Sequence, residues 1–98
     1  MDVVHRPGDP PGRPLRVRVG DEVVVALHGW PAYAWTPVEV VAGTMAVISA
    51  GTDDGTARAR VRATGAGEAE LRSTSSFSGD RFGPPTRLWR LLVHVEAP

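Results

Sequence analysis

The chain has 98 residues, the size of one small domain, and 42% of them are apolar, which is enough to fill one hydrophobic core. Eleven basic and eleven acidic residues give a formal net charge of zero, which argues against a protein that binds nucleic acid or a membrane surface through its charge. There is no cysteine, so disulfides, thiolate metal sites and a cysteine nucleophile are excluded.

Proline and glycine crowd the start of the chain, so we expect residues 1–14 to form an N-terminal arm without a regular core. This arm either packs along a sheet edge or hangs free. Apolar residues and arginines then alternate over residues 15–19, a period-two pattern that predicts a half-buried strand. Gly20-Asp21 predicts a turn, and a second strand follows over residues 22–28.

A Gly-Trp-Pro turn ends the second strand, and we expect a third strand over residues 33–41. Pro37 lacks a backbone donor, so it is predicted at a bulge or a sheet edge. Residues 38–48 are ambiguous, because Val, Ala and Met there also suit a helical turn. Alternatively, residues 45–49 form a short strand, and residues 51–55 form a flexible turn.

The clearest alternation in the sequence lies at residues 56–63, where alanines and Val61 are predicted to face the core and three arginines to face water. A turn at residues 64–67 leads to a strand over residues 68–73. The segment 75–86 is rich in Ser, Gly and Pro and is predicted to be the longest internal loop. The last strand is expected over residues 87–95, with Trp89, Leu91, Val93 and Val95 on one face.

About seven short strands with Gly/Pro turns between them predict an all-β protein, a single immunoglobulin-like sandwich over residues 15–96. Trp35, central in its strand, is expected to lie in the core. The segment 63–71 also has the spacing of the immunoglobulin corner, where the chain crosses between sheets. Gly65, Ala69 and Leu71 stand at the positions of the usual Asp, Tyr and Cys.

From about residue 15 to residue 96, this order and spacing resemble the chagasin-like inhibitors of papain-type cysteine peptidases. Gly20-Asp21 matches the turn before that family's second strand. The family's first loop carries Asn-Pro-Thr-Thr-Gly-Tyr/Phe-x-Trp, which Pro31, Tyr33 and Trp35 match in part. The resemblance implies an immunoglobulin-like sandwich whose loops at one end enter the active-site cleft of a peptidase.

Two further loops extend the resemblance. Gly51–Gly55 stands at the place of the family's glycine-rich second loop, and Phe77 stands where the third loop has a Trp or Phe. The departures are specific. The first loop lacks Thr-Thr-Gly and is shorter, the second has Asp53 and Asp54 in place of small glycines, and Ser75-Ser76 replaces the third loop's Arg-Pro.

The resemblance implies binding of a protein partner, in particular a papain-type cysteine peptidase, by occlusion of its cleft without chemistry. The residues it assigns to partner binding are Trp30, Pro31, Ala32, Tyr33, Gly51, Thr52, Asp53, Gly55, Ser75, Ser76 and Phe77. Trp30 and Phe77 are expected at one end of the sandwich, because the loops that carry them cluster there. Two alternatives remain open: Trp30 caps the sandwich, and Phe82 folds back onto it.

A second hypothesis is a non-inhibitory immunoglobulin-like module, structural or interacting, with an unknown partner. An enzyme, a metal site and a cofactor are not expected, because His5, His28 and His94 are scattered and no serine has a His and an acid at a catalytic spacing. The arginines of residues 58–62 either recognise anions or form a solvated sheet face.

The start of the chain has neither the basic residues nor the apolar core of a signal peptide, and no apolar run has the roughly 20 residues that span a bilayer. Taken as written, the chain is therefore expected to be soluble and cytoplasmic. A chain whose leader has been removed would look the same. We expect a monomer.

Overall fold

The computed structural model describes residues 1–10, 12–77 and 87–98. These residues form strands and no helix, so the described part contains no helix that could cross a membrane. The strands are β1 (Asp2–His5), β2 (Leu15–Arg18), β3 (Glu22–Leu27), β4 (Tyr33–Trp35), β5 (Glu39–Ala42), β6 (Met45–Asp53), β7 (Thr56–Ala63), β8 (Gly67–Phe77) and β9 (Arg87–Glu96).

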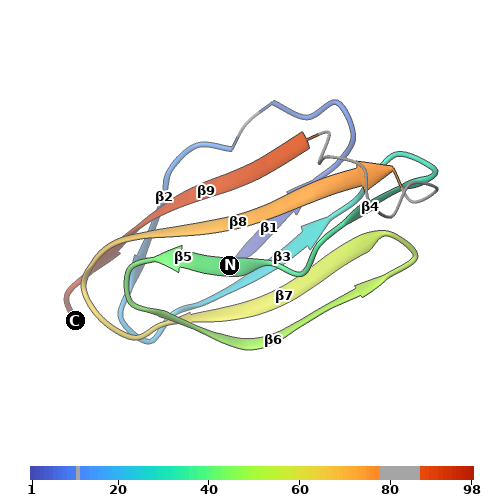
Figure 1. Cartoon of the computed structure of the whole chain (residues 1–98). Helices are drawn as coiled ribbons and strands as arrows, with labels where there is room; N and C mark the ends of the chain where they lie inside the picture. Colours follow the sequence, from blue (N-terminus) through green and yellow to red (C-terminus); the bar gives the residue numbers. More distant parts are fainter. Residues whose placement is uncertain (11, 78–86) are drawn as a thin grey trace.

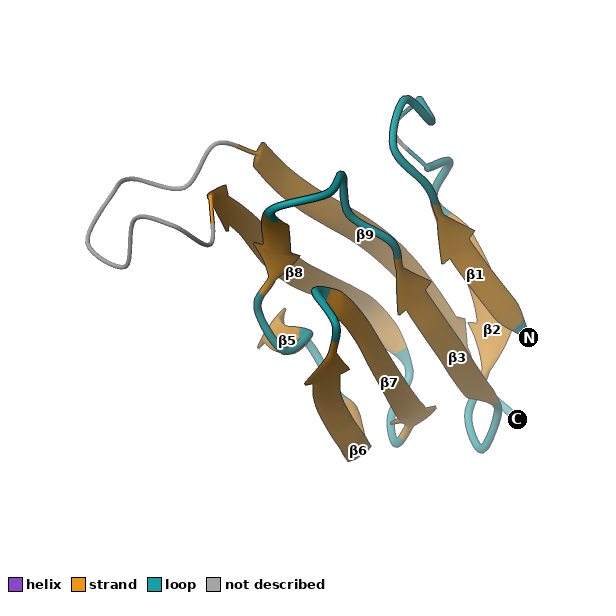
Figure 2. Ribbon diagram, turned by 90° about the vertical axis from the view of Figure 1, so that its right-hand side faces the viewer, coloured by secondary structure: helices purple, strands orange, loops and turns teal. Residues whose placement is uncertain are grey.

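The strands form two sheets packed face to face (Figures 1 and 2). The first sheet has the order β1-β3-β7-β6, and the second has the order β2-β9-β8-β4, with β5 also paired to β8. β1 and β2 join their neighbours in parallel, and the other pairs are antiparallel. The all-β sandwich predicted from the sequence is confirmed.

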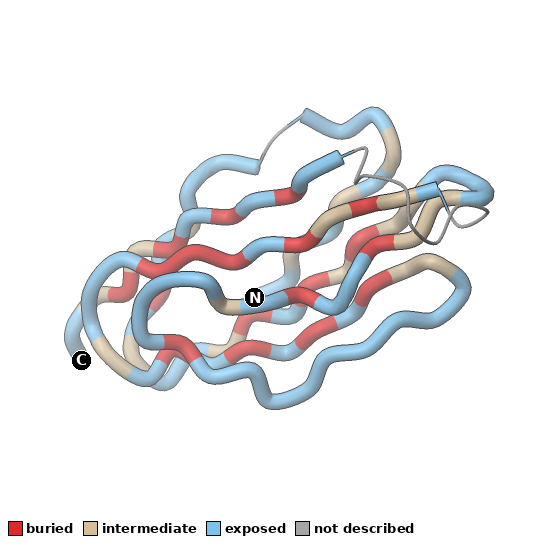
Figure 3. Tube along the Cα trace, in the orientation of Figure 1, coloured by how far each residue is buried: buried red, intermediate tan, exposed pale blue. Residues whose placement is uncertain are grey.

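Alternating side chains build the core between the sheets, seen in Figure 3 as red segments along β3, β7, β8 and β9. On β7 the alanines and Val61 are buried and the three arginines are exposed, as predicted. On β9 the residues Trp89, Leu91, Val93 and Val95 are buried, also as predicted. Burial of each Val or Leu contributes about 1.5–3 kcal/mol, which makes this alternation the main determinant of the fold.

Several predicted element boundaries are wrong. The described residues hold nine strands where about seven were expected. The third strand of the prediction is two strands, β4 and β5, because the segment around Pro37 cannot continue a ladder. Residues 38–48, for which a helical turn and a short strand were both considered, contain β5 and the start of β6, so the strand alternative holds there. Residues 75–77 belong to β8 and residues 51–53 to β6, so neither segment is a loop there.

The N-terminal arm takes the first of the two arrangements considered. Its residues Asp2–His5 form β1 at the edge of the first sheet, parallel to β3. The amide of Val24 donates to the carbonyl of Met1, and the amide of His28 donates to the carbonyl of His5, at 2.8 Å each. The arm therefore closes an edge that β3 would otherwise leave open.

The predicted corner does carry the chain from β7 in the first sheet to β8 in the second. No tyrosine is present to secure it. Thr44 takes this part: its hydroxyl donates to the carbonyl of Gly65 at 2.8 Å, and its own carbonyl accepts from the amide of Thr64 at 3.1 Å. Gly43, just before it, has a φ of 88° and lies directly against Glu68 and Ala69.

A buried carboxylate also links two strands on the outer face of the second sheet. Glu70 is 8% exposed, accepts a hydrogen bond from Nη2 of Arg90 at 2.8 Å and accepts another from Arg72. These hydrogen bonds, with that of Arg90 the larger effect, hold the pKa of Glu70 below its ordinary value of 4.5. The contact with Arg90 therefore joins β8 to β9 on the outer face of the sheet, opposite the core.

We predict that Gly43→Ala destabilises the fold by about 3 kcal/mol or more, because a left-handed residue gains a Cβ that must also displace backbone. An added Cβ would lie 2.2 Å from the carbonyl oxygen of Glu68. The measurement is urea unfolding. Gly51→Ala is the control, since its Cβ meets nothing within 4 Å, and a change within about 1 kcal/mol is expected. Equal losses in the two variants would contradict this account.

We predict that Glu70→Gln lowers stability near neutral pH and that the deficit disappears in acid. The pKa of Glu70 is lowered in the folded state, so its contribution is complete above the ordinary value of 4.5 and is lost as the pH falls through the folded-state pKa. Urea unfolding of both proteins from pH 7 downward measures this. Asp54→Asn, at an exposed turn residue, is the control; a deficit for Glu70→Gln that is constant with pH would refute the prediction.

Candidate functional site

The first part of the candidate site is the turn between β3 and β4. The amide of Tyr33 donates to the carbonyl of Trp30 at 3.0 Å, which closes the turn. Pro31 at its second position and a positive φ of 67° at Ala32 are the pattern of a type II turn. Alanine pays a steric cost there that glycine does not. This turn holds Trp30 at the surface, with 46% of it exposed.

Trp35, on the core side of that turn, fixes its position. It is 5% exposed, as predicted for a core residue, and its indole N–H donates to the carbonyl of His28 at 3.2 Å. The ring of His5 meets the indole edge-on, with ring centroids 5.9 Å apart. The two ends of the β3–β4 connection are therefore anchored to the core, while its middle remains exposed.

The second part of the site is the two-residue turn between β6 and β7. Asp54 and Gly55 both have positive φ, 50° and 77°, as a type I′ hairpin turn requires. The carbonyl of Gly55 accepts a hydrogen bond from the amide of Trp35 at 3.2 Å. A Cβ on Gly55 would lie 2.8 Å from the carbonyl of Tyr33, so glycine is needed for the second turn to contact the first.

The third part is the end of β8. Phe77 pairs with Tyr33 in the ladder, and their rings are in contact, with centroids 5.6 Å apart. Phe77 is 46% exposed and Ser76 is partly exposed, whereas Ser75 is 2% exposed and buried. Trp30 and Phe77 thus lie at one end of the sandwich, as expected, because Tyr33 closes the turn at Trp30 and contacts Phe77. This is the end at which β8 finishes beside β4, on the right of Figure 1. Phe82 lies outside the described residues.

Arg87, the first residue of β9, was not identified from the sequence as part of the site. Its guanidinium lies over the indole of Trp30, 5.9 Å from the ring centroid, within the range of a cation–π contact. Trp30, Pro31, Tyr33 and Arg87 line a hollow of about 560 Å³. The sequence held one indication of this role. Arg87 is a cation at the start of β9, and β9 pairs with β8 so that Arg87 lies opposite Ser75.

The structure brings most of the predicted residues together. Trp30, Pro31, Ala32 and Tyr33 form the first turn, Gly55 touches it, and the ring of Phe77 packs at a tilt against Tyr33. Gly51, Thr52 and Asp53 lie further along the same hairpin, exposed on β6. We call the exposed surface formed by Trp30–Tyr33, Asp54–Gly55, Ser76–Phe77 and Arg87 the aromatic end.

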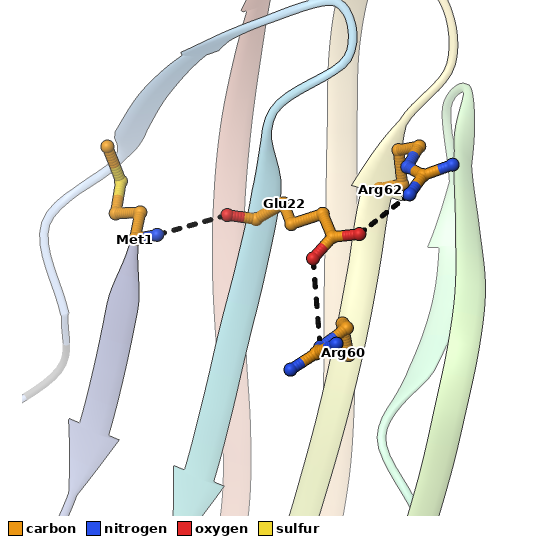
Figure 4. A network of polar contacts seen from close by, with 4 residues as sticks. All are labelled: Met1, Glu22, Arg60 and Arg62. Atoms are coloured by element: carbon orange, nitrogen blue, oxygen red, sulfur yellow. Dashed lines mark hydrogen bonds and ion pairs between the residues drawn. The ribbon is translucent and has the colours of Figure 1, made fainter.

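Two arginines of the β7 stripe, Arg60 and Arg62, share one carboxylate, that of Glu22 on β3 (Figure 4). Glu22 accepts a hydrogen bond from Arg62 at 2.7 Å and forms an ion pair with Arg60 at 3.7 Å. The hydrogen bond from Arg62, and then the charge of Arg60, hold the pKa of Glu22 below its ordinary value. The ammonium of Met1 donates to the backbone carbonyl of Glu22 at 3.1 Å. This arrangement favours a solvated sheet face over an anion site.

Comparison with solved structures finds a cysteine protease inhibitor, EhICP2, from Entamoeba histolytica. It matches with a TM-score of 0.69 at 14% identity, over 97% of this chain and 95% of that one. This is the same fold. Amebosin also matches, with a TM-score of 0.59 at 22% identity, over 98% of this chain and 97% of that one. The predicted chagasin-like resemblance is thereby confirmed for the fold.

The sequence itself matches no protein-family model and no curated protein. Within the described residues, no group of three or more His, Asp or Glu side chains is placed to hold a metal ion.

We predict that Ala32→Gly stabilises the protein by about 1 kcal/mol, because it removes the Cβ from a left-handed residue. Ala50→Gly, at an exposed strand position without positive φ, is the control and should cost about 0.5–1 kcal/mol through chain entropy. Thermal unfolding of both variants measures the difference. A loss of stability for Ala32→Gly would show that the turn does not need a left-handed residue.

Proposed function

We propose that this domain binds a papain-type cysteine peptidase with its aromatic end and blocks the active-site cleft without chemistry. The observation that carries the proposal is the convergence of three separate segments at one end of an inhibitor-like sandwich. Trp30 and Tyr33 of the first segment line a hollow beside Arg87, and the ring of Phe77 from the end of β8 contacts the ring of Tyr33. Large aromatic residues at a surface are the usual anchors of protein interfaces.

Rigidity of the aromatic end supports this function. The turn at Trp30–Tyr33 is closed by its own hydrogen bond, and Trp35 holds the second turn through the carbonyl of Gly55. Preformed loops lose little conformational entropy on binding, so a modest contact area yields useful affinity. An inhibitor that occupies a cleft also has to resist cleavage, and a turn anchored at both ends is a poor substrate.

The roles of individual residues follow from their exposure. Trp30 enters the cleft beside the catalytic cysteine, because it is the exposed aromatic of the first turn. Phe77 lies on one flank, and Gly51–Gly55 lies on the other. Ser76 adds a polar contact. Ser75 supports the binding surface from inside the sandwich, since its side chain is buried in β8. Arg87 keeps the indole of Trp30 in place through the cation–π contact.

The second candidate is an immunoglobulin-like module that binds a different protein. The shorter first loop and the absence of Arg-Pro before Phe77 favour it, because these are the places where the chain departs from the inhibitor motifs. The same aromatic end would serve this partner. Neither candidate requires a catalytic residue or a cofactor, and we propose that the chain is not an enzyme.

The test is inhibition of papain and of a cathepsin L-type peptidase by the purified protein, with Trp30→Ala alongside. We expect inhibition that Trp30→Ala weakens about 30-fold, the loss of a single interface hot spot. Leu92→Ala is the matched control, since Leu92 is also an exposed apolar residue, 42% exposed in the middle of β9. It should leave inhibition unchanged. Absence of inhibition at high micromolar concentration would reject a papain-type target and leave the second candidate.

A further inference from the structure

We infer that the free edge of β6 pairs with β6 of a second copy of this chain, antiparallel and about a two-fold axis, so that the first sheet continues across both copies. This inference does not rest on the proposed peptidase-blocking function, and its surface shares Gly51–Asp53 of β6 with one flank of that site. It departs from the monomer expected from the sequence.

The first observation is the composition and exposure of β6. It is nine residues long, and every residue after Met45 is exposed, seen in Figure 3 as a nearly continuous pale-blue strand. No charged residue and no proline occurs from Met45 to Thr52. Val47 and Ile48 are large apolar residues at the surface, 42% and 47% exposed. A long uncharged edge of this kind is a template for pairing with another strand.

The other described edges are protected. β1 has four residues and begins with a charge, Asp2. β2 carries Arg16 and Arg18 and directly follows Pro14. The edge formed by β4 and β5 is interrupted at Pro37. Short strands, charges and prolines are the devices by which sheet edges avoid association. Among the edge strands that the structure describes, β6 is the longest, contains no proline and carries its one charge, Asp53, at its last residue.

The register of the pairing follows from the hairpin. A bulge between Val47 and Ser49 interrupts the ladder, so the regular part of the edge runs from Ser49 to Asp53. Asp53 and Thr56 close a two-residue turn. Backbone groups therefore alternate along the strand so that those of Ala50 and Thr52 point to the free edge. An antiparallel partner that uses these groups places Gly51 opposite Gly51 of the second copy.

Charge complementarity selects a second copy as the occupant. In this register Asp53 of each copy falls opposite Ser49 of the other, on the sheet face that carries Arg60 behind Ser49 and Arg58 behind Gly51. Neither Asp53 nor Arg58 has an ion pair within the described residues. Arg58 on β7 is paired with Gly51 on β6. Because Gly51 has no side chain, the side chain of Arg58 can extend across β6 to the free edge. A hollow of about 400 Å³ lies over this corner, lined in part by Gly51, Asp53 and Arg58.

Two such contacts form at once, because the two-fold axis repeats each of them. The formal net charge of zero means that the copies do not repel each other. About four main-chain hydrogen bonds join five residues of each copy, which is less contact than a permanent dimer has. The association is therefore weak, with a dissociation constant on the order of 100 µM.

The test uses the absence of cysteine in the chain. In Gly51→Cys, the two new thiols lie opposite each other in the paired copies, at a spacing that a cross-strand disulfide can bridge. A Cβ added at Gly51 would have no atom within 4 Å, and Gly51 does not have a positive φ. The variant should therefore fold. At about 100 µM under mild oxidation, we expect Gly51→Cys to form dimers at least about tenfold faster than Ser49→Cys, whose thiols would lie too far apart.

Sedimentation of the unmodified protein, up to about 1 mM, is the second measurement, with Asp53→Lys beside it. We expect reversible dimers whose dissociation constant rises at least about tenfold in Asp53→Lys, because a lysine faces Arg58. A wild-type protein that stays monomeric overturns the inference. So do equal cross-linking rates in the two cysteine variants, which would place any association at another surface. No peptidase is used, so these outcomes are independent of the proposed function.

Discussion

The packing and hydrogen bonding of Trp35 determine how the aromatic end of this sandwich is built. Its backbone belongs to the second sheet, while its amide binds Gly55 at the end of the first sheet's hairpin. Its indole N–H binds the carbonyl of His28, where β3 leaves the first sheet. One buried residue therefore ties both sheets and two turns together. The remaining aromatic residues of that end take their positions from it.

Exposure of these aromatics rises stepwise from the core to the surface. Trp35 is buried, Tyr33 is partly exposed, and Trp30 and Phe77 are each 46% exposed. The strand period places Tyr33 and Trp35 on one face, and the strained turn at Ala32 then carries Trp30 beyond the sheet. Arg87 and Phe77 support the outer rings from the second sheet. An aromatic surface continuous with the core is stiff, which suits binding by shape without chemistry.

The sequence predicts those parts of the fold in which burial alternates. β7 and the buried face of β9 could be predicted because one side of each strand lies in the core. The length of β6 could not, because an exposed edge strand has no burial pattern to read. The end of β8 was missed because it is a run of Thr and Ser residues that resembles a loop in sequence, although Ser75 within it is buried. The contact of Arg87 with Trp30 depends on sheet order, which no local pattern contains.

Two surfaces share one hairpin, and this limits how they can be used together. Thr52 and Asp53 flank the aromatic end, and they also lie in the part of β6 that faces a second copy. A partner strand on this edge would stand beside the turn at Asp54–Gly55 and obstruct a large enzyme approaching that end. Binding of a peptidase and pairing of copies are therefore expected to compete. By linkage, each association weakens the other by the same factor, so binding of the proposed peptidase would shift the chain toward the monomer.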